Sequence, residues 1–194
     1  YCTRHNRIHN ERNKKLIFEF PNYVELDFVE EIKNESRKHI NFLFNHGSYN
    51  REGHTVDITA VEDLKELDYK IHQLMKGIQE TIVATRYKPQ HSSADSGYEY
   101  HAYNPGQRCY LHSDGETQNE FLRYASVIIQ LSDNREGGEL IFPNQNKTIK
   151  SEAGKLIVFP PYGGYSHYVT PSTTMREVLV AWFIYKDIRI NNVG

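Results

Sequence analysis

The chain has 194 residues and a formal net charge of −2, with 38% hydrophobic and 25% charged residues. This composition is ordinary for a folded domain, and its length predicts a single domain over residues 1–194. The near-zero charge argues against general nucleic-acid binding, and no apolar run approaches the ~20 residues that span a membrane. Two isolated cysteines, Cys2 and Cys109, predict neither a zinc ribbon nor a disulfide scaffold, and we expect a reducing, cytoplasmic setting.

The first half of the chain predicts a supporting layer over residues 16–97. Residues 1–15 are polar and basic and form a candidate disordered segment. Apolar residues then recur at intervals of three and four, which is typical of amphipathic helices. The expected elements are a strand at 16–20, a helix at 26–44, a loop at 45–55, a long helix at 60–85 and a loop at 89–97.

The second half changes to short segments rich in Val, Ile, Phe and Tyr, separated by Gly, Pro, Asn and Asp. Such segments predict strands at 98–103, 110–112, 124–131, 139–142, 148–149, 156–159, 167–169 and 178–185. Eight short strands at this spacing favour a β-sandwich or jelly roll. The expected fold class is therefore α+β, with a double-stranded β-helix (jelly-roll) core at 98–188 and N-terminal supporting helices.

One predicted strand presents a histidine and a carboxylate in alternation. His112 and Asp114 are two positions apart, so their side chains point to the same face of a strand. With His167, from a later strand, they could form the facial triad of non-haem iron(II) oxygenases. Arg176 follows His167 by nine positions and opens the last apolar run. A guanidinium there can pair with the distal carboxylate of 2-oxoglutarate; an arginine that merely caps a strand is the plainer alternative.

The order of several motifs along the chain favours the metal site and the 2-oxoglutarate-binding role of Arg176 over the plainer alternative. Residues 98–185 resemble the prolyl 4-hydroxylase-like branch of the iron(II)/2-oxoglutarate-dependent dioxygenases. The matching stretches are residues 103–114, 123–133, 136–143, 154–160 and 167–171, followed by Arg176 and Trp182. The first 97 residues lie outside this resemblance, so their interpretation rests on composition and spacing alone.

The resemblance implies the cofactors and the residues that hold them. His112, Asp114 and His167 match the iron(II) ligands, and no catalytic residue beyond them is implied. Arg176 matches the basic residue that binds 2-oxoglutarate, and Tyr103 matches a tyrosine that hydrogen-bonds this co-substrate. Dioxygen is the implied oxidant, and ascorbate is a candidate reductant. Gln130 stands where many members carry a tyrosine facing the co-substrate, and its amide can still donate a hydrogen bond.

The substrate side is less well defined by the resemblance. Arg123 matches an arginine near the substrate channel of peptide-hydroxylating members. Cys109 stands where some prolyl hydroxylases carry a substrate-facing tyrosine, which departs from their pattern. Tyr100 is a further candidate for lining the channel, whereas His101 is expected to face away from it.

Three functions remain open at this point. Hydroxylation of a prolyl or other amino-acid residue in a peptide or protein comes first, and hydroxylation of a free amino acid or small metabolite comes second. An open groove would favour peptides, and a closed pocket with an additional carboxylate-binding arginine would favour a free amino acid. The third is a non-catalytic jelly-roll binding module. Neither nucleic acid nor a membrane is an expected partner, and the sequence does not indicate the oligomeric state.

Overall fold

The computed structural model describes residues 16–40, 50–89, 91, 93–115, 121–134 and 136–189. The predicted disordered segment at 1–15 lies outside this part of the chain. The elements in chain order are β1 (Phe18–Phe20), α2 (Leu26–Arg37), β2 (His54–Asp57), η1 (Glu62–Leu64), α3 (Lys65–Ile78), the π-helical η2 (Gln79–Val83), α4 (Ala84–Tyr87), β3 (Ser93–Tyr103), β4 (Cys109–His112), β5 (Phe121–Gln130), β6 (Leu140–Phe142), η3 (Pro143–Gln145), β7 (Lys147–Ile149), β8 (Leu156–Phe159), η4 (Gly163–Tyr165), β9 (His167–Val169) and β10 (Arg176–Arg189).

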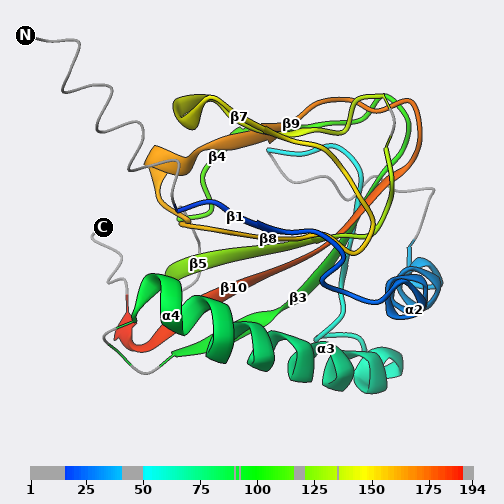
Figure 1. Ribbon diagram of the computed structural model, residues 1–194. Helices are drawn as coiled ribbons and strands as arrows, with labels where there is room; N and C mark the ends of the chain where they lie inside the picture. The colour runs from blue at the N-terminus through cyan, green and yellow to red at the C-terminus, as the bar shows by residue number, and fades with distance from the viewer. Residues whose placement is uncertain are drawn as a thin grey trace, which may run out of the picture.

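The strands form two antiparallel sheets that lie over one another (Figure 1). The larger sheet has the order β1-β8-β5-β10-β3-β2, and the smaller has the order β4-β9-β6-β7. From β3 to β10 the chain alternates between the two sheets, except at β6 and β7, which pair with each other in the smaller sheet. The two sheets thus form the expected double-stranded β-helix, with helices beside it. The predicted α+β fold class is confirmed.

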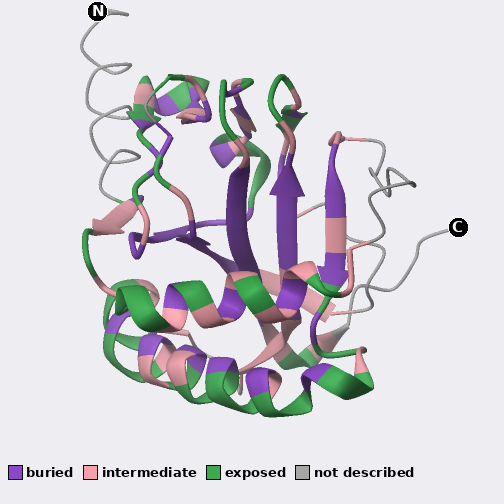
Figure 2. Cartoon of the chain, turned by 90° about the vertical axis from the view of Figure 1, so that its right-hand side faces the viewer, coloured by how far each residue is buried: buried purple, intermediate pink, exposed green. Residues whose placement is uncertain are grey.

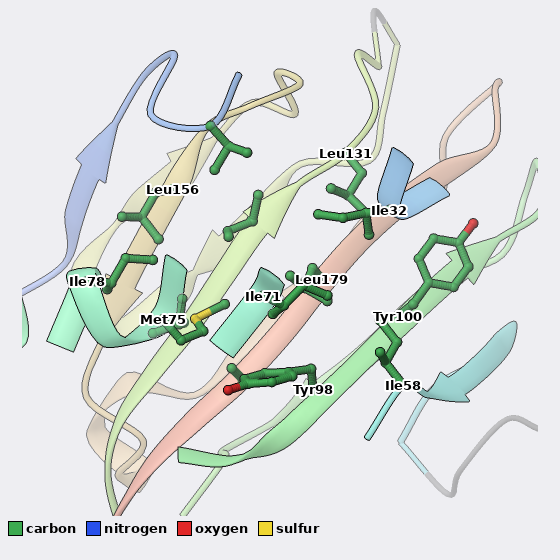
Figure 3. Packing of buried hydrophobic residues seen from close by; sticks show 14 of the residues in the cluster. Ile32, Ile58, Ile71, Met75, Ile78, Tyr98, Tyr100, Leu131, Leu156 and Leu179 are labelled. Carbon is green, nitrogen blue, oxygen red and sulfur yellow. The ribbon is translucent and has the colours of Figure 1, made fainter. Parts of the chain in front are cut away.

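The helices cover the outer face of the larger sheet (Figures 1 and 2). Leu67, Ile71, Met75 and Ile78 recur along one side of α3, and all four are buried against the sheet (Figure 3). This spacing of three and four residues is the reason that the segment forms a helix with one apolar face. No helix among the described residues is long and apolar enough to cross a membrane.

Both faces of the central strand β10 are buried, and this explains its continuous apolar run. Leu179 and Phe183 belong to the core under the helices, whereas Val178, Val180 and Trp182 belong to the core between the two sheets. A strand that is covered on both faces needs apolar residues at every position. The alternation also determines which residues of the sheet face the space between the sheets.

The structure differs from the predicted elements in several places. The loop expected at 45–55 is wrong at its end, because β2 begins at His54 and pairs with β3; residues 45–49 lie outside the described part of the chain. The loop expected at 89–97 is wrong, because β3 begins at Ser93 and residues 93–95 pair with β10; pairing with the neighbouring strand outweighs the low strand preference of this polar stretch. The first helix ends at Arg37. The long helix divides into η1, α3, η2 and α4, and Thr81 and Thr85 donate to carbonyls one turn back in its π-helical part.

Candidate active site

Two neighbouring strands of the smaller sheet bring the predicted triad together. His112 ends β4 and pairs in register with His167, which begins β9. Asp114 lies two residues beyond the end of β4, and its Oδ1 is 3.4 Å from His112 Nε2 and 3.8 Å from His167 Nε2. Ligand atoms of the three residues all lie within 4.8 Å of one another. This is the spacing at which one cation can bridge two imidazoles and a carboxylate.

Both histidines are oriented by the backbone two residues before them. The Nδ1–H of His112 donates to the Tyr110 carbonyl at 2.8 Å, and that of His167 donates to the Tyr165 carbonyl at 3.1 Å. Since each Nδ1 donates to a backbone carbonyl, Nε2 is the nitrogen that each ring turns toward Asp114 and could offer to a metal. Such outer hydrogen bonds are typical of metal-binding histidines, because they fix both tautomer and ring orientation.

The electrostatics of the triad also fit a cation. Burial disfavours the ionised form of Asp114, but the neighbouring His167 and His112 hold its pKa well below the ordinary range. Burial also disfavours protonation of His112, yet the hydrogen bond to Asp114 raises its pKa to about 10. Desolvation lowers the pKa of His167, so that ring stays neutral. The buried Asp114 carboxylate thus attracts a proton to the space between it and the two histidine rings. A metal cation such as iron(II) can take the place of that proton.

A pocket between the sheets adjoins the triad and contains a buried arginine. Arg176 is 2% exposed, its Nε donates to the Gly138 carbonyl at 3.1 Å, and its guanidinium carbon lies 5.5 Å from the Tyr103 ring centre. Desolvation lowers its pKa, and no ion pair joins it to a carboxylate of the described residues. A buried cation of this kind is costly unless an anion binds beside it, and the distal carboxylate of 2-oxoglutarate is such an anion.

Tyr103 and Cys109 line the same pocket, as the resemblance implied. Burial raises the pKa of Tyr103, so its hydroxyl stays protonated and can donate to a carboxylate. The Cys109 sulfur lies 3.6 Å from His112 Nδ1. Gln130 pairs with the pocket residue Val178 but does not line the pocket itself; its Oε1 accepts from the Glu152 amide at 2.8 Å, and its Nε2 has no partner among the described residues.

Arg123 reaches the triad from β5. Its Nη1 donates to the Asp114 carbonyl at 3.1 Å, and its guanidinium lies 3.8 Å from the centre of the Trp182 ring. Trp182 lines the pocket, so this pair forms a wall beside the metal ligands. Stacking on the indole holds the guanidinium in one plane.

The expectations for Tyr100 and His101 are both wrong, for one reason. Tyr100 is fully buried in the core under the helices (Figure 3), and its hydroxyl donates to Glu177. His101 instead lines the pocket. Side chains alternate along a strand, so the residue that shares a face with Tyr103 is His101 and not Tyr100. Counting from Tyr103 could have placed both residues correctly.

Arg51 is a pocket residue that the sequence analysis missed. It lies opposite Cys109 in an isolated bridge and lines the pocket. Its Nη1 contacts the ring nitrogens of His101 at 2.9 and 3.2 Å, and its Nη2 is 3.4 Å from a Glu99 carboxylate oxygen. Burial, together with Arg51, lowers the pKa of His101 to about 4. His101 is therefore neutral, and its Nε2–H donates to Glu99 at 2.7 Å.

Comparison with known proteins agrees with this geometry. Residues 98–184 match the model of the 2OG-Fe(II) oxygenase superfamily. This range contains the triad, Arg176, the whole of β4 and β5, and most of β10. Over this stretch the chain is similar to that superfamily. The oxygenase domain thus implies iron(II) and 2-oxoglutarate as its cofactor and co-substrate. A sequence search among curated proteins gave no match.

Solved structures of prolyl hydroxylases share the fold of the oxygenase. A viral collagen prolyl hydroxylase from Paramecium bursaria Chlorella virus-1, solved with 2-oxoglutarate, is 17% identical, with a TM-score of 0.72 over 88% of this chain and 96% of that one. A Pseudomonas putida prolyl-4-hydroxylase is 20% identical, with a TM-score of 0.63 over 88% and 93%. A Trichoplax adhaerens prolyl hydroxylase bound to a fragment of hypoxia-inducible factor is 16% identical, with a TM-score of 0.66 over 95% and 92%.

Proposed function

We propose that this oxygenase hydroxylates an aliphatic C–H of a prolyl or other amino-acid residue in a peptide or protein. The observation that carries the proposal is the triad together with the buried Arg176 of the adjoining pocket, which has no ion-pair partner among the described residues. The prolyl hydroxylases that share the fold support a peptide substrate, since one of them binds a peptide in its solved structure.

Each pocket residue has a distinct part in this proposal. His112, Asp114 and His167 would hold iron(II), because two histidines and a carboxylate are the ligand set of non-haem iron oxygenases. Arg176 binds the distal carboxylate of 2-oxoglutarate, and the Tyr103 hydroxyl donates to the same co-substrate. When bound, the metal and 2-oxoglutarate supply the oxidising chemistry, in which dioxygen is consumed and succinate and carbon dioxide are released; ascorbate is a candidate reductant.

The residues near the opening orient the substrate. Arg123, held over Trp182, presents a fixed donor beside the metal ligands. Cys109 leaves room where a larger side chain would fill the pocket. The apolar residues Val180 and Leu140 line the remainder and exclude water from the reacting C–H bond.

Arg51 bears on the alternative of a free amino acid or small metabolite. An additional arginine in the pocket would favour recognition of a free carboxylate. However, the guanidinium of Arg51 already contacts His101 and Glu99, and its Nε is buried without a partner among the described residues. A residue whose charge is partly balanced in this way favours a neutral peptide over a free carboxylate, so the peptide remains our first candidate.

The proposal is tested by anaerobic titration of the full chain with iron(II) and 2-oxoglutarate. A visible metal-to-ligand charge-transfer band should form and should vanish in His112→Ala. It should persist in the matched variant His91→Ala, whose exposed ring lies near Asp187 of β10. Succinate release is then compared between proline-containing peptides and free amino acids. Absence of the band in the folded protein would favour the non-catalytic binding module.

A further inference from the structure

A serine on β5 lies on the face of the larger sheet that is turned toward the metal pocket. Ser126 is directly opposite Trp182 on β10 and directly opposite Phe159 on β8, and residues that are directly opposite in antiparallel strands share one face. Trp182 lines the pocket, and the centre of the Phe159 ring lies 4.8 Å from that of the His167 ring. The Ser126 side chain therefore points toward the space beside the candidate metal ligands.

The hydroxyl of Ser126 is fully buried and has no hydrogen-bond partner among the described residues. Buried polar groups are paired in nearly all native structures, because an unpaired one keeps the cost of its lost hydration. Alanine would occupy the same position without that cost. The serine therefore indicates a polar partner on the pocket side of the sheet.

Asp114 offers an acceptor for this hydroxyl. Its Oδ1 faces the Nε2 atoms of His112 and His167, whereas no hydrogen bond from the described residues reaches its Oδ2. Burial and the two histidines have the larger effects on the pKa of Asp114, and the Ser126 hydroxyl lowers this pKa further, which makes the two side chains neighbours. The same strand also holds the Asp114 backbone, because Arg123 Nη1 donates to its carbonyl at 3.1 Å.

We propose that the Ser126 hydroxyl donates to Asp114 Oδ2 and thereby keeps Oδ1 turned toward iron(II). The inference rests on the metal centre of the proposed function, but not on the identity of the substrate. A carboxylate with a hydrogen bond on one oxygen offers the other as a single ligand, whereas an unheld carboxylate can rotate and bind through both. Ser126 is thus a positioning residue that acts on the metal through Asp114.

Metal affinity tests this role without turnover. The full chain is titrated anaerobically with iron(II) in competition with a chromophoric chelator, in the absence of 2-oxoglutarate and peptide. Ser126→Ala should weaken iron(II) binding by about 10- to 100-fold, the usual effect of losing an outer partner of a metal ligand. Ser126→Thr keeps the hydroxyl and should bind much more tightly than the alanine variant. Ser36→Ala removes another fully buried hydroxyl without a described partner, on α2, and should bind iron(II) as the natural chain does.

Two further measurements separate positioning from packing. Since the Ser126 hydroxyl is unpaired within the described part of the chain, Ser126→Ala should melt at or above the natural chain before iron(II) is added, and should gain less stability from iron(II) by mass action. Cobalt(II) at saturation gives the second signal, because its visible bands depend on the number and arrangement of its ligands. These bands should change in Ser126→Ala and should be unchanged in Ser36→Ala.

The outcomes distinguish this inference from the proposed function. Natural iron(II) affinity in Ser126→Ala, with natural cobalt(II) bands, overturns the inference, whereas hydroxylation of a peptide by the same chain leaves the proposed function standing. A loss of affinity that threonine restores, in a chain that hydroxylates no peptide, supports the inference and contradicts the proposed function. Equal losses in alanine and threonine variants that melt like the natural chain would show that the volume of serine matters and not its hydroxyl, and would overturn the inference.

Discussion

Arg176 shows how a single residue can serve function at the expense of stability. Its side chain is 2% exposed and lacks an ion-pair partner among the described residues. Replacing such a buried cation by an apolar side chain of similar length often leaves a protein as stable or makes it more stable. We therefore predict that Arg176→Met leaves the thermal midpoint unchanged or raises it, while 2-oxoglutarate binding weakens by about 10- to 150-fold, the value of a charge-assisted hydrogen bond.

Thermal melts with and without 2-oxoglutarate measure both effects at once. The natural chain should gain stability from the co-substrate by mass action, and Arg176→Met should lose most of this gain. Arg108→Met removes an exposed arginine and should keep it. An Arg176→Met protein that melts far below the natural chain without ligand would show that the guanidinium has a structural role instead.

The sequence predicted the triad residues because their chemistry depends on local spacing. His112 and Asp114 share a face by alternation, His167 and Arg176 follow in later predicted strands, and the resemblance supported these four and added Tyr103. Arg51 could not be found in this way, because its place in the pocket depends on the bridge to Cys109, 58 positions later. The surroundings of Gln130 could not be predicted either. Its side-chain oxygen accepts a hydrogen bond from the backbone amide of Glu152, which lies in a turn that is distant in sequence.

At the scale of elements, the turn before β6 holds the start of β10 in place. Gly137 has φ +76°, and a Cβ there would lie 1.9 Å from the Pro171 carbonyl oxygen. The next residue, Gly138, accepts the hydrogen bond from Arg176 Nε. We predict that Gly137→Ala destabilises the protein by about 2–4 kcal/mol, because the strained φ and the backbone clash act together, and that it weakens 2-oxoglutarate binding.

Gly106→Ala separates the two causes of that loss. Gly106 has a similar φ of +84°, but no atom lies within 4 Å of a Cβ built there. Only the backbone strain applies, so we expect a loss of about 1 kcal/mol in urea unfolding and no change in 2-oxoglutarate binding. Equal losses for both variants would mean that the turn relaxes away from Pro171 and that the clash is not significant.

The elements that the sequence predicted are those with a strong local pattern. The short runs of β8 and β9 were confirmed to the residue. The apolar spacing of the predicted helix at 60–85 was confirmed in α3, although that segment divides into several elements. The start of β3 and the whole of β2 were missed, because their polar sequences form strands only through pairing with β10 and β3. Strand formation there depends on a neighbour that is distant in sequence.

At the scale of the whole molecule, one ion pair fastens the helical layer to the sheet beneath the pocket. Arg37 of α2 donates to both carboxylate oxygens of Glu177 on β10, at 2.7 and 2.6 Å, and the Tyr100 hydroxyl donates to the same carboxylate. Glu177 follows Arg176 directly but points to the opposite face. The hydrogen bond to Glu177 raises the pKa of Arg37 above its ordinary range, so the pair stays ionised.

The Glu177 side chain is 3% exposed, whereas that of Arg37 is 38% exposed. Removal of the arginine therefore leaves a buried carboxylate without its positively charged partner. We predict that Arg37→Met lowers the free energy of unfolding by about 2–4 kcal/mol. Lys38→Met, which breaks an exposed pair at the end of the same helix, should cost less than about 0.5 kcal/mol. Glu177→Gln in the Arg37→Met background should restore part of the lost stability, since the amide needs no counter-charge. A double-mutant cycle in urea should give a coupling energy of about 1–3 kcal/mol between the two residues. Strictly additive losses would show that water already solvates Glu177, and that the helices are held to the sheet by apolar packing alone.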